Sequence, residues 1–301
     1  MGQKDVKSRI GSVKNIQKIT RAMEMVAAAR LRRAEQRIEA LRPYASAIRR
    51  MTRQAAEAAQ NVPNLPILNE HESVSTVGLL LVTGDRGLAG AFNSQIVRAG
   101  VRVAAEHEGE GRSMAWYASG RRGTSSLQFR GREVVGSYTG FTDRPAYGDA
   151  RDIASDLMTA YVDGNVDQVE IIYNHYISPL TQRVTRETLL PLQQATILEA
   201  EEDEDEKAGG GEEAKRALVE YEPDPEDILQ RLIPAYVEIS IFRALLESTA
   251  SEHGARMTAM RNASQNAGDI IKDLTLQMNR ERQAEITQEI MEVVAGAEGL
   301  R

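Results

Sequence analysis

Both ends of the chain carry apolar residues at the alternating spacing of four and three that is typical of coiled-coil helices. In residues 1–60 this stripe consists of Val6, Ile10, Val13, Ile16, Ile19, Met23, Val26, Ala27, Leu31, Ala34, Ile38, Leu41, Ala45 and Ile48. The spacing slips twice, so we expect the supercoil to change locally. Good helix formers are abundant, and Pro43 should kink the helix because proline has no amide hydrogen. The pattern predicts one long helix.

A second long helix is predicted at the other end, over residues 222–301. Asp224 can cap it, and Pro225 suits the first helical position. Its stripe consists of Leu229, Leu232, Tyr236, Ile239, Met260, Ser264, Ala267, Ile271, Leu274, Met278, Ile286, Ile290, Val293 and Ala297. A helix over residues 227–297 would be about 105 Å long at about 1.5 Å per residue, so it must project beyond any compact domain. Since one helix enters the middle region and the other leaves it, the two can pair antiparallel within one molecule.

Between the helices the pattern changes to that of a small α/β domain. An apolar run of strand length at residues 77–83 precedes a glycine-rich turn and a helical stretch at 89–107. Further strands are predicted at 113–118, 133–138, 168–177 and 183–190, with a helix at 149–162. This alternation favours a mostly parallel sheet covered by helices on both faces.

We therefore predict a fold of mixed α+β and α/β class. It comprises a long antiparallel coiled coil of the N- and C-terminal helices and a small α/β domain with a mostly parallel sheet. The predicted parts are a shaft helix at 1–60, the α/β domain at 74–198, an acidic loop and linker at 199–221, and a second shaft helix at 222–301.

The overall charge of −7 hides two regions of opposite sign. Residues 1–57 carry a net charge of +9, whereas residues 199–227 carry −11. Residues 199–216 are too charged and glycine-rich to pack, and they lack the spacing of a calcium loop, which favours a solvated surface loop. The basic first helix has Tyr44 as its only aromatic residue, which favours an acidic protein partner over nucleic acid. A basic coiled-coil scaffold for nucleic acid remains an alternative.

Candidate chemistry is sparse. The chain has no cysteine, which excludes disulfides and thiol chemistry, and its four histidines lack metal-ligand spacing. No apolar run approaches the roughly 20 residues that span a bilayer, so we expect no direct membrane insertion. Residues 84–90 read GDRGLAG, whose spacing matches neither a dinucleotide fingerprint nor a P-loop. A structural turn or docking surface is favoured there, a nucleotide-binding α/β enzyme is kept as an alternative, and no cofactor, metal or catalytic residue is predicted.

Several motifs at both ends are similar to one family. Residues 8–10 read SRI and residues 18–27 read KITRAMEMVA, while residues 251–260 read SEHGARMTAM and residues 262–267 read NASQNA. Further matches, in order, are GDRGL at 84–88, Gly90, Asn93, Asn279, Arg280, RQA at 282–284, IT at 286–287, EI at 289–290 and GA at 296–297. Together these motifs resemble the gamma subunit of rotary ATP synthases along nearly the whole chain.

This resemblance implies a function for the two shaft helices. They would sit inside a ring of alternating catalytic and regulatory subunits, beta and alpha, while the α/β domain would stand on the membrane c-ring of proton-carrying subunits. An epsilon subunit would be a further partner. The chain would be a non-catalytic rotor at the cytoplasmic face of a bacterial membrane, bound peripherally, and its rotation would shift the catalytic subunits between conformations.

The resemblance also implies individual contacts. Met23 corresponds to the family's bearing region, and Arg282, Gln283 and Thr287 correspond to positions that meet an acidic loop of a catalytic subunit. Arginine suits that place because it can form a bidentate, charge-assisted bond with a carboxylate. Tyr221 and Glu222 correspond to the foot that meets the membrane ring, although Val219 stands where some relatives carry an aromatic residue.

These interpretations separate in a binding test on the purified chain. A nucleotide-binding enzyme would melt at a higher temperature with added nucleotide, because a ligand that binds only the folded state stabilises it. A nucleic-acid scaffold would bind DNA at low salt and release it at moderate ionic strength. For a rotor subunit we expect no rise in melting temperature and no salt-sensitive DNA binding.

Overall fold

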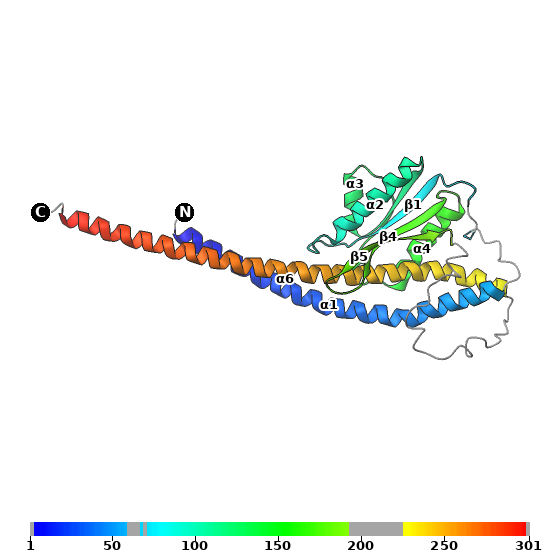
Figure 1. The fold of residues 1–301 in the computed structure, drawn as a ribbon, viewed down its shortest axis with the longest axis horizontal. Coiled ribbons are helices and arrows are strands. Elements are labelled where there is room, and N and C mark those ends of the chain that lie inside the picture. Colours follow the sequence, from blue (N-terminus) through cyan, green and yellow to red (C-terminus); the bar gives the residue numbers. More distant parts are fainter. Residues whose placement is uncertain (1–2, 59–66, 69–70, 193–224, 299–301) are drawn as a thin grey trace.

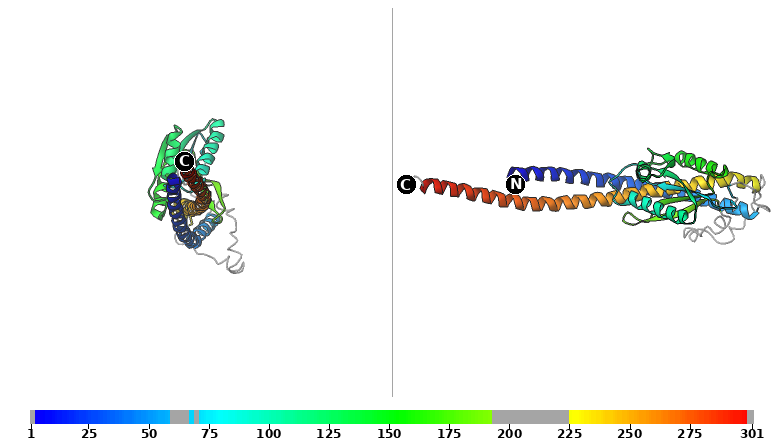
Figure 2. Two further views of the ribbon diagram at one scale, coloured as in Figure 1. Left: turned by 90° about the vertical axis from the view of Figure 1, so that its left-hand side faces the viewer. Right: turned by 90° about the horizontal axis from the view of Figure 1, so that it is seen from above.

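The computed structural model describes residues 3–58, 67–68, 71–192 and 225–298. Two long helices, α1 (Gln3–Ala58) and α6 (Pro225–Glu298), lie side by side and antiparallel, and they form a rod that extends well beyond a compact sheet domain (Figures 1 and 2). The predicted fold class is confirmed. The predicted acidic loop at 199–216, Tyr221, Glu222 and the capping residue Asp224 lie outside the described residues.

The domain is built on a five-stranded sheet with the order β3-β2-β1-β4-β5. The strands are β1 (Thr76–Val82), β2 (Ser113–Ser119), β3 (Val134–Tyr138), β4 (Gln168–Tyr176) and β5 (Gln182–Leu190). The first four are parallel, and β5 is antiparallel to β4. The central strand β1 is buried from its second residue onward, which explains why its sequence is a continuous apolar run.

Helices cover both faces of this sheet. The helices α2 (Phe92–Gly109) and α3 (Arg121–Phe129) pack on one face, around Leu79, Trp116 and Leu127. The helix α4 (Tyr147–Val162) and the shaft helix α6 pack on the other, around Leu80, Ile153 and Ile171. The sequence did not predict α3, because RRGTSSLQF is short and contains a glycine and several weak helix formers.

The shaft helix α6 is the central element of the molecule. All residues from 244 to 254 are buried, because the sheet and α4 cover one side of α6 and α1 covers the other. A helix that is buried all round belongs to the core and not to the surface. The domain and the rod therefore share one packed centre.

The seam of α1 follows a single register, so the two predicted slips are wrong. The positions that face α6 keep an unbroken spacing of four and three: Val6, Ile10, Val13, Gln17, Thr20, Glu24, Ala27, Leu31, Ala34, Ile38, Leu41, Ala45, Ile48, Thr52 and Ala55 are all buried or half-buried. By contrast Ile16, Ile19 and Val26 are 53%, 58% and 54% exposed.

Polar contacts allow the seam to hold this register. The Gln17 amide donates to the backbone oxygen of Ser264 at 3.3 Å, and Arg261 Nε donates to Glu24 Oε1 at 2.9 Å. A constant heptad keeps the same side of α1 against α6 along the whole seam. Where the apolar residues of α1 lie beside that side, polar residues occupy the seam positions instead.

One further expectation needs correction. The end of α6 has no partner helix among the described residues, because α6 continues past the start of α1 (Figure 1). Ile286, Ile290 and Val293 are accordingly 48%, 58% and 72% exposed, not part of a seam within this chain. The helix α1 continues through Pro43, and Figure 1 shows it changing direction in its second half, which agrees with the predicted kink in one long helix.

A matched pair of substitutions tests the register. Ile48 is 8% exposed in the seam and Ile19 is 58% exposed on the same helix. We expect Ile48→Ala to lower the free energy of unfolding by about 2–4 kcal/mol, because it leaves a cavity, and Ile19→Ala to change it by less than about 0.5 kcal/mol. Urea unfolding of both variants checks this. Equal losses would contradict the assigned seam.

Candidate functional site

Backbone amides of the glycine-rich turn after β1 donate hydrogen bonds to side chains of the same domain. The amide of Gly84 donates to Asn93 Oδ1 at 2.8 Å, and the amide of Asp85 donates to Thr142 Oγ1 at 2.9 Å. The Asp85 carboxylate in turn accepts from the amides of Arg121 and Gly140 at 3.0 and 2.9 Å. Burial raises the pKa of this carboxyl, but the hydrogen bonds outweigh it and hold the pKa below its ordinary value.

The helix α6 fills the crevice above this turn. In open parallel sheets a nucleotide binds outside the carboxyl ends of the central strands. Here Glu252 of α6 lies so close that a Cβ added to Gly84 would be 2.6 Å from its carboxyl carbon. Glu252 is 2% exposed and pairs with Arg256 at 2.5 Å, and Arg256 also donates to the backbone oxygen of Gly87 at 3.3 Å. The amides of Gly84 and Asp85 are therefore not available to a pyrophosphate, and Glu252 fills the space beside Gly84.

The four histidines lie in separate places. His71 pairs with Asp167 at 2.7 Å, and His175 pairs with Glu247 at 2.5 Å. Within the described ranges, no group of three or more His, Asp or Glu side chains could hold a metal ion.

His107 belongs to a buried polar cluster. Its Nε2 lies 3.3 Å from Glu170 Oε1, and Arg112 donates to its Nδ1 at 2.9 Å. Arg186 donates to both oxygens of Glu170, at 2.7 and 2.8 Å. Every member has a partner, so the cluster holds α2 against β4 and β5.

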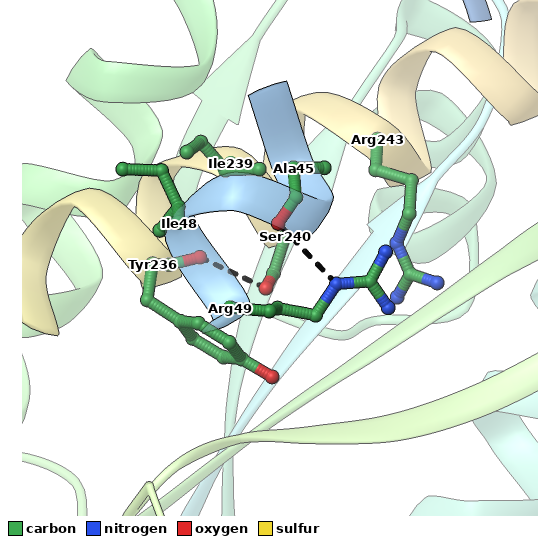
Figure 3. A pocket seen from close by; sticks show the side chains of 7 residues that line it. All are labelled: Ala45, Ile48, Arg49, Tyr236, Ile239, Ser240 and Arg243. Carbon is green, nitrogen blue, oxygen red and sulfur yellow. Dashed lines mark hydrogen bonds between the residues drawn. The ribbon is translucent and has the colours of Figure 1, made fainter. Parts of the chain in front are cut away.

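A small cavity lies where α1 and α6 pack near the domain (Figure 3). Ala45, Ile48 and Arg49 of α1 and Tyr236, Ile239, Ser240 and Arg243 of α6 line it. Its volume of about 30 Å³ has space for about one or two water molecules and no organic cofactor.

A larger groove lies between α1 and the glycine-rich turn. Its volume is about 540 Å³, within the range of ligand and peptide sites. Ile19, Ala22, Met23, Val26 and Ala27 of α1 form an apolar wall, and Gly87 and Leu88 of the turn, with His253 of α6, form part of the opposite side. Burial and neighbouring Arg256 lower the pKa of His253 to about 4, so this imidazole is neutral at pH 7.

Four arginines surround this groove: Arg30, Arg86, Arg122 and Arg256. Asp143 accepts from Arg30 at 2.8 Å and lies 3.3 Å from Arg86, and Glu252 pairs with Arg256, so two carboxylates face the four arginines. Arg86 is still 65% exposed. The groove thus combines an apolar wall with surplus positive charge.

Leu88 adds a strained residue to the groove. Its φ is +63°, the left-handed region that a leucine rarely adopts, and its side chain is 63% exposed. Such a backbone persists only where neighbouring contacts hold it. The turn therefore presents a large apolar side chain to the outside beside the exposed stripe of α1.

The structure separates the sequence-predicted contact residues into two surfaces. Met23 lines the groove, whereas Arg282, Gln283 and Thr287 are exposed on the unpaired end of α6, with Thr287 Oγ1 donating to Gln283 O at 2.8 Å. Residue 282 lies about 39 Å along α6 from residue 256, at about 1.5 Å per residue.

The sequence pattern does not identify Ile19, Leu88 or the four arginines as groove residues. The available signal was the polar set Gln17, Thr20 and Glu24, which continues the heptad where the apolar residues leave it.

Comparisons with known proteins agree along the whole chain. A family profile described as ATP synthase matches residues 2–300. The chain is 43% identical to the ATP synthase gamma chain of Streptomyces avermitilis, covering 98% of this chain and 94% of that protein. It is also 43% identical to the ATP synthase gamma chain of Rubrobacter xylanophilus, covering 99% and 98%. The chain belongs to the ATP synthase gamma-chain family.

Solved structures agree with this family. The central stalk and c-ring structure of the Tetrahymena thermophila mitochondrial ATP synthase contains a chain that is 28% identical, with a TM-score of 0.60, covering 82% of this chain and 99% of that one. A chain of the Euglena gracilis mitochondrial ATP synthase is 16% identical with a TM-score of 0.67, covering 99% and 94%, and supports the fold alone.

As a gamma-chain family member, the protein is a rotor subunit of the central stalk of an ATP synthase and is not itself catalytic. Of the helices in the described ranges, none combines the length and hydrophobicity needed to cross a membrane.

One substitution tests whether α6 fills the nucleotide crevice. Gly84→Ala would force the buried Glu252 carboxylate away from Arg256, so we expect a loss of about 1–3 kcal/mol in the free energy of unfolding. Gly11→Ala is the matched control, because nothing lies within 4 Å of its added Cβ, and this helical position should gain about 0.5–1 kcal/mol. Urea unfolding measures both. A neutral Gly84→Ala would show that Glu252 moves freely and the crevice is open.

Proposed function

We propose that this subunit couples rotation of a proton-carrying c-ring in a bacterial membrane to conformational change in the beta subunits that make ATP. The single observation that supports this most directly is the rod. It projects beyond the domain, and its surface differs from one side to the other. The domain end would stand on the membrane ring at the cytoplasmic face, bound peripherally, and the free end would enter the ring of alpha and beta subunits.

The dimensions of the rod suit this role. At about 1.5 Å per residue, the 74 residues of α6 span about 111 Å, and the 56 residues of α1 span about 84 Å. The domain packs on α6 from about Val237 to Ala255, so the rod beyond this part is not covered by it. The remaining length is available to partners.

The exposed apolar stripe of α1 supports a contact with the catalytic ring. Ile16, Ile19 and Val26 are more than half exposed, and Met23 lies among them. Because this stripe lies on one side of the rod, a different subunit of the ring would face the apolar surface as the rod rotates. The surrounding arginines favour a partner segment that combines apolar side chains with carboxylates.

The unpaired end of α6 supports a second contact. Arg282, Gln283 and Thr287 are solvent-exposed, so their polar groups are available to an acidic loop of a beta subunit. Because the shaft differs from side to side, each catalytic subunit would be held in a different conformation, and turning the shaft would shift these populations.

The contacts at the membrane end stay predictions from the sequence. We propose that Tyr221 and Glu222 meet the c-ring and that an epsilon subunit binds the same stalk. Bacterial relatives at 43% identity favour the bacterial setting.

Reconstitution tests the proposal. Alpha and beta subunits from the same source are mixed with the full chain or with a chain that ends before residue 280. We expect the full chain to assemble with the ring and raise multisite ATPase turnover, and the truncated chain to weaken assembly or turnover. If nothing copurifies with the full chain, the rotor role is wrong.

Two single substitutions test the separate contact surfaces. Arg282→Ala should weaken binding to the ring by about tenfold or more, because a charge-assisted hydrogen bond contributes about 1.5–3 kcal/mol, whereas Arg280→Ala on the same exposed segment should have little effect.

Arg86→Glu should likewise lower turnover, and Arg98→Glu on α2 should not, because Arg98 lies outside the groove. If a control variant lost as much binding or turnover as its partner variant, the effect would come from overall charge and not from these contacts.

A further inference from the structure

The end of β4 contacts both helices of the rod through two consecutive residues. His175 Nδ1 lies 2.5 Å from Glu247 Oε2 of α6, and the hydroxyl of Tyr176 donates to the Glu35 carboxylate of α1. Between them, Ser251 Oγ of α6 donates to the backbone oxygen of Asn174 at 3.1 Å. The β4–β5 hairpin therefore holds the two helices together where they cross the domain.

The hairpin also packs tightly against α6 at its tip. A Cβ added to Gly254 would be 3.0 Å from the backbone oxygen of Pro179, and Gln182 Nε2 donates to that oxygen at 3.0 Å. Tyr176 lies in the same apolar cluster as Leu31 and Ala250. Any loosening of the hairpin would therefore reach α1 and α6 at once.

The two side chains of the His175–Glu247 pair differ in burial. The Glu247 side chain is 8% exposed, whereas the His175 side chain is 36% exposed. The imidazole can exchange its proton with solvent, but the carboxylate cannot replace a lost partner with bulk water. A buried carboxylate that loses its charged partner is destabilised.

Other charged groups face this pair from every packed element. Tyr173 and Tyr176 come from β4, Arg183 and Glu187 from β5, Arg243 from α6 and Glu35 from α1. The hydrogen bond to Glu247 raises the pKa of His175, burial lowers it, and Arg183 and Arg243 lower it further. The net effect raises the His175 pKa above its ordinary value of 6.5.

We propose that His175 and Glu247 form a pH-sensitive clasp that fastens the β4–β5 hairpin, and through Tyr176 also α1, to the rod. With His175 protonated, the ion pair holds the hairpin on α6. With His175 neutral, Glu247 keeps only a weaker hydrogen bond and the hairpin opens more often.

The direction of the pH dependence follows from the raised pKa. A group whose pKa is higher in the folded state stabilises the fold when it is protonated. The stabilisation is therefore complete below about pH 6.5 and is lost as the pH rises through the raised value. The joint between domain and rod should be stiffer in acid than in base. Its effect on coupling rests on the proposed rotor function, whereas the clasp itself does not.

Amide hydrogen exchange on the full-length chain tests the clasp directly. Three proteins are compared between pH 6 and pH 8.5, with rates corrected for intrinsic exchange: wild type, His175→Lys, which stays charged, and His175→Gln, which stays neutral. All keep His71, His107 and His253, so the contributions of those residues cancel in the differences.

We expect wild-type protection across residues 173–186 to match that of His175→Lys at pH 6 and to fall several-fold, to that of His175→Gln, at pH 8.5. The two variants should each show little pH dependence in this segment. A wild-type profile that parallels His175→Gln over the whole range would overturn the clasp.

A second variant tests whether the clasp affects α1 through Tyr176. Tyr176→Phe removes the hydroxyl that reaches Glu35, so pH should still change protection in the hairpin but no longer in α1 around residue 35. If α1 keeps its pH dependence, the clasp does not act through Tyr176.

In the reconstituted ATP synthase complex, the pH profile of turnover is then compared for wild type and His175→Lys. A clasp seen in the isolated chain without assembly of the complex would count against the rotor function. A complex that assembles while exchange shows no His175 dependence would count against the clasp.

Discussion

Residues 244–254 of α6 are buried on every side, since the sheet and α4 pack on one side of the helix and α1 packs on the other. This arrangement makes one helix both a layer of the domain and half of the rod. Torque applied to the domain reaches the rod through a packed core, which has few voids and transmits strain well. The α1 helix is held less directly, through its seam with α6 and through side-chain contacts such as Arg30 with Asp143.

The demands of pairing and of partner contact compete for the surface of α1. A constant heptad fixes the two helices in register, and Gln17, Thr20 and Glu24 keep that register through a stretch where the apolar residues lie beside the seam. Polar seam positions weaken the pairing locally, but they leave Ile19 and Val26 exposed. Exposed apolar residues that adjoin a groove mark a surface for a partner, and here they occur on the part of the rod next to the domain.

The α/β domain shows how a fold typical of nucleotide binding can serve another purpose. Its strand order β3-β2-β1-β4 and the position of a glycine-rich turn after β1 are like those of nucleotide-binding sheets, although the glycine spacing differs. Yet the Glu252–Arg256 pair packs over the turn at Gly84, and Asn93 and Thr142 accept hydrogen bonds from the amides of Gly84 and Asp85. The switch point of the sheet has become the place where the rod is attached, so fold alone would suggest the wrong function.

The sequence by itself determined the two long helices, the parallel sheet and the family, because periodicity over many turns and a continuous apolar strand are strong local signals. It could not decide which of two neighbouring apolar stripes on α1 is the seam, since Ile16 and Ile19 have helical spacing just as Val13 and Ala27 do. That choice depends on which side of α1 meets α6, where Ser264 accepts from Gln17. Nor could it place Leu88 opposite Met23, or His175 against Glu247, because these contacts join residues far apart in the chain. Only the tertiary structure, in which α6 passes between the sheet and α1, brings them together.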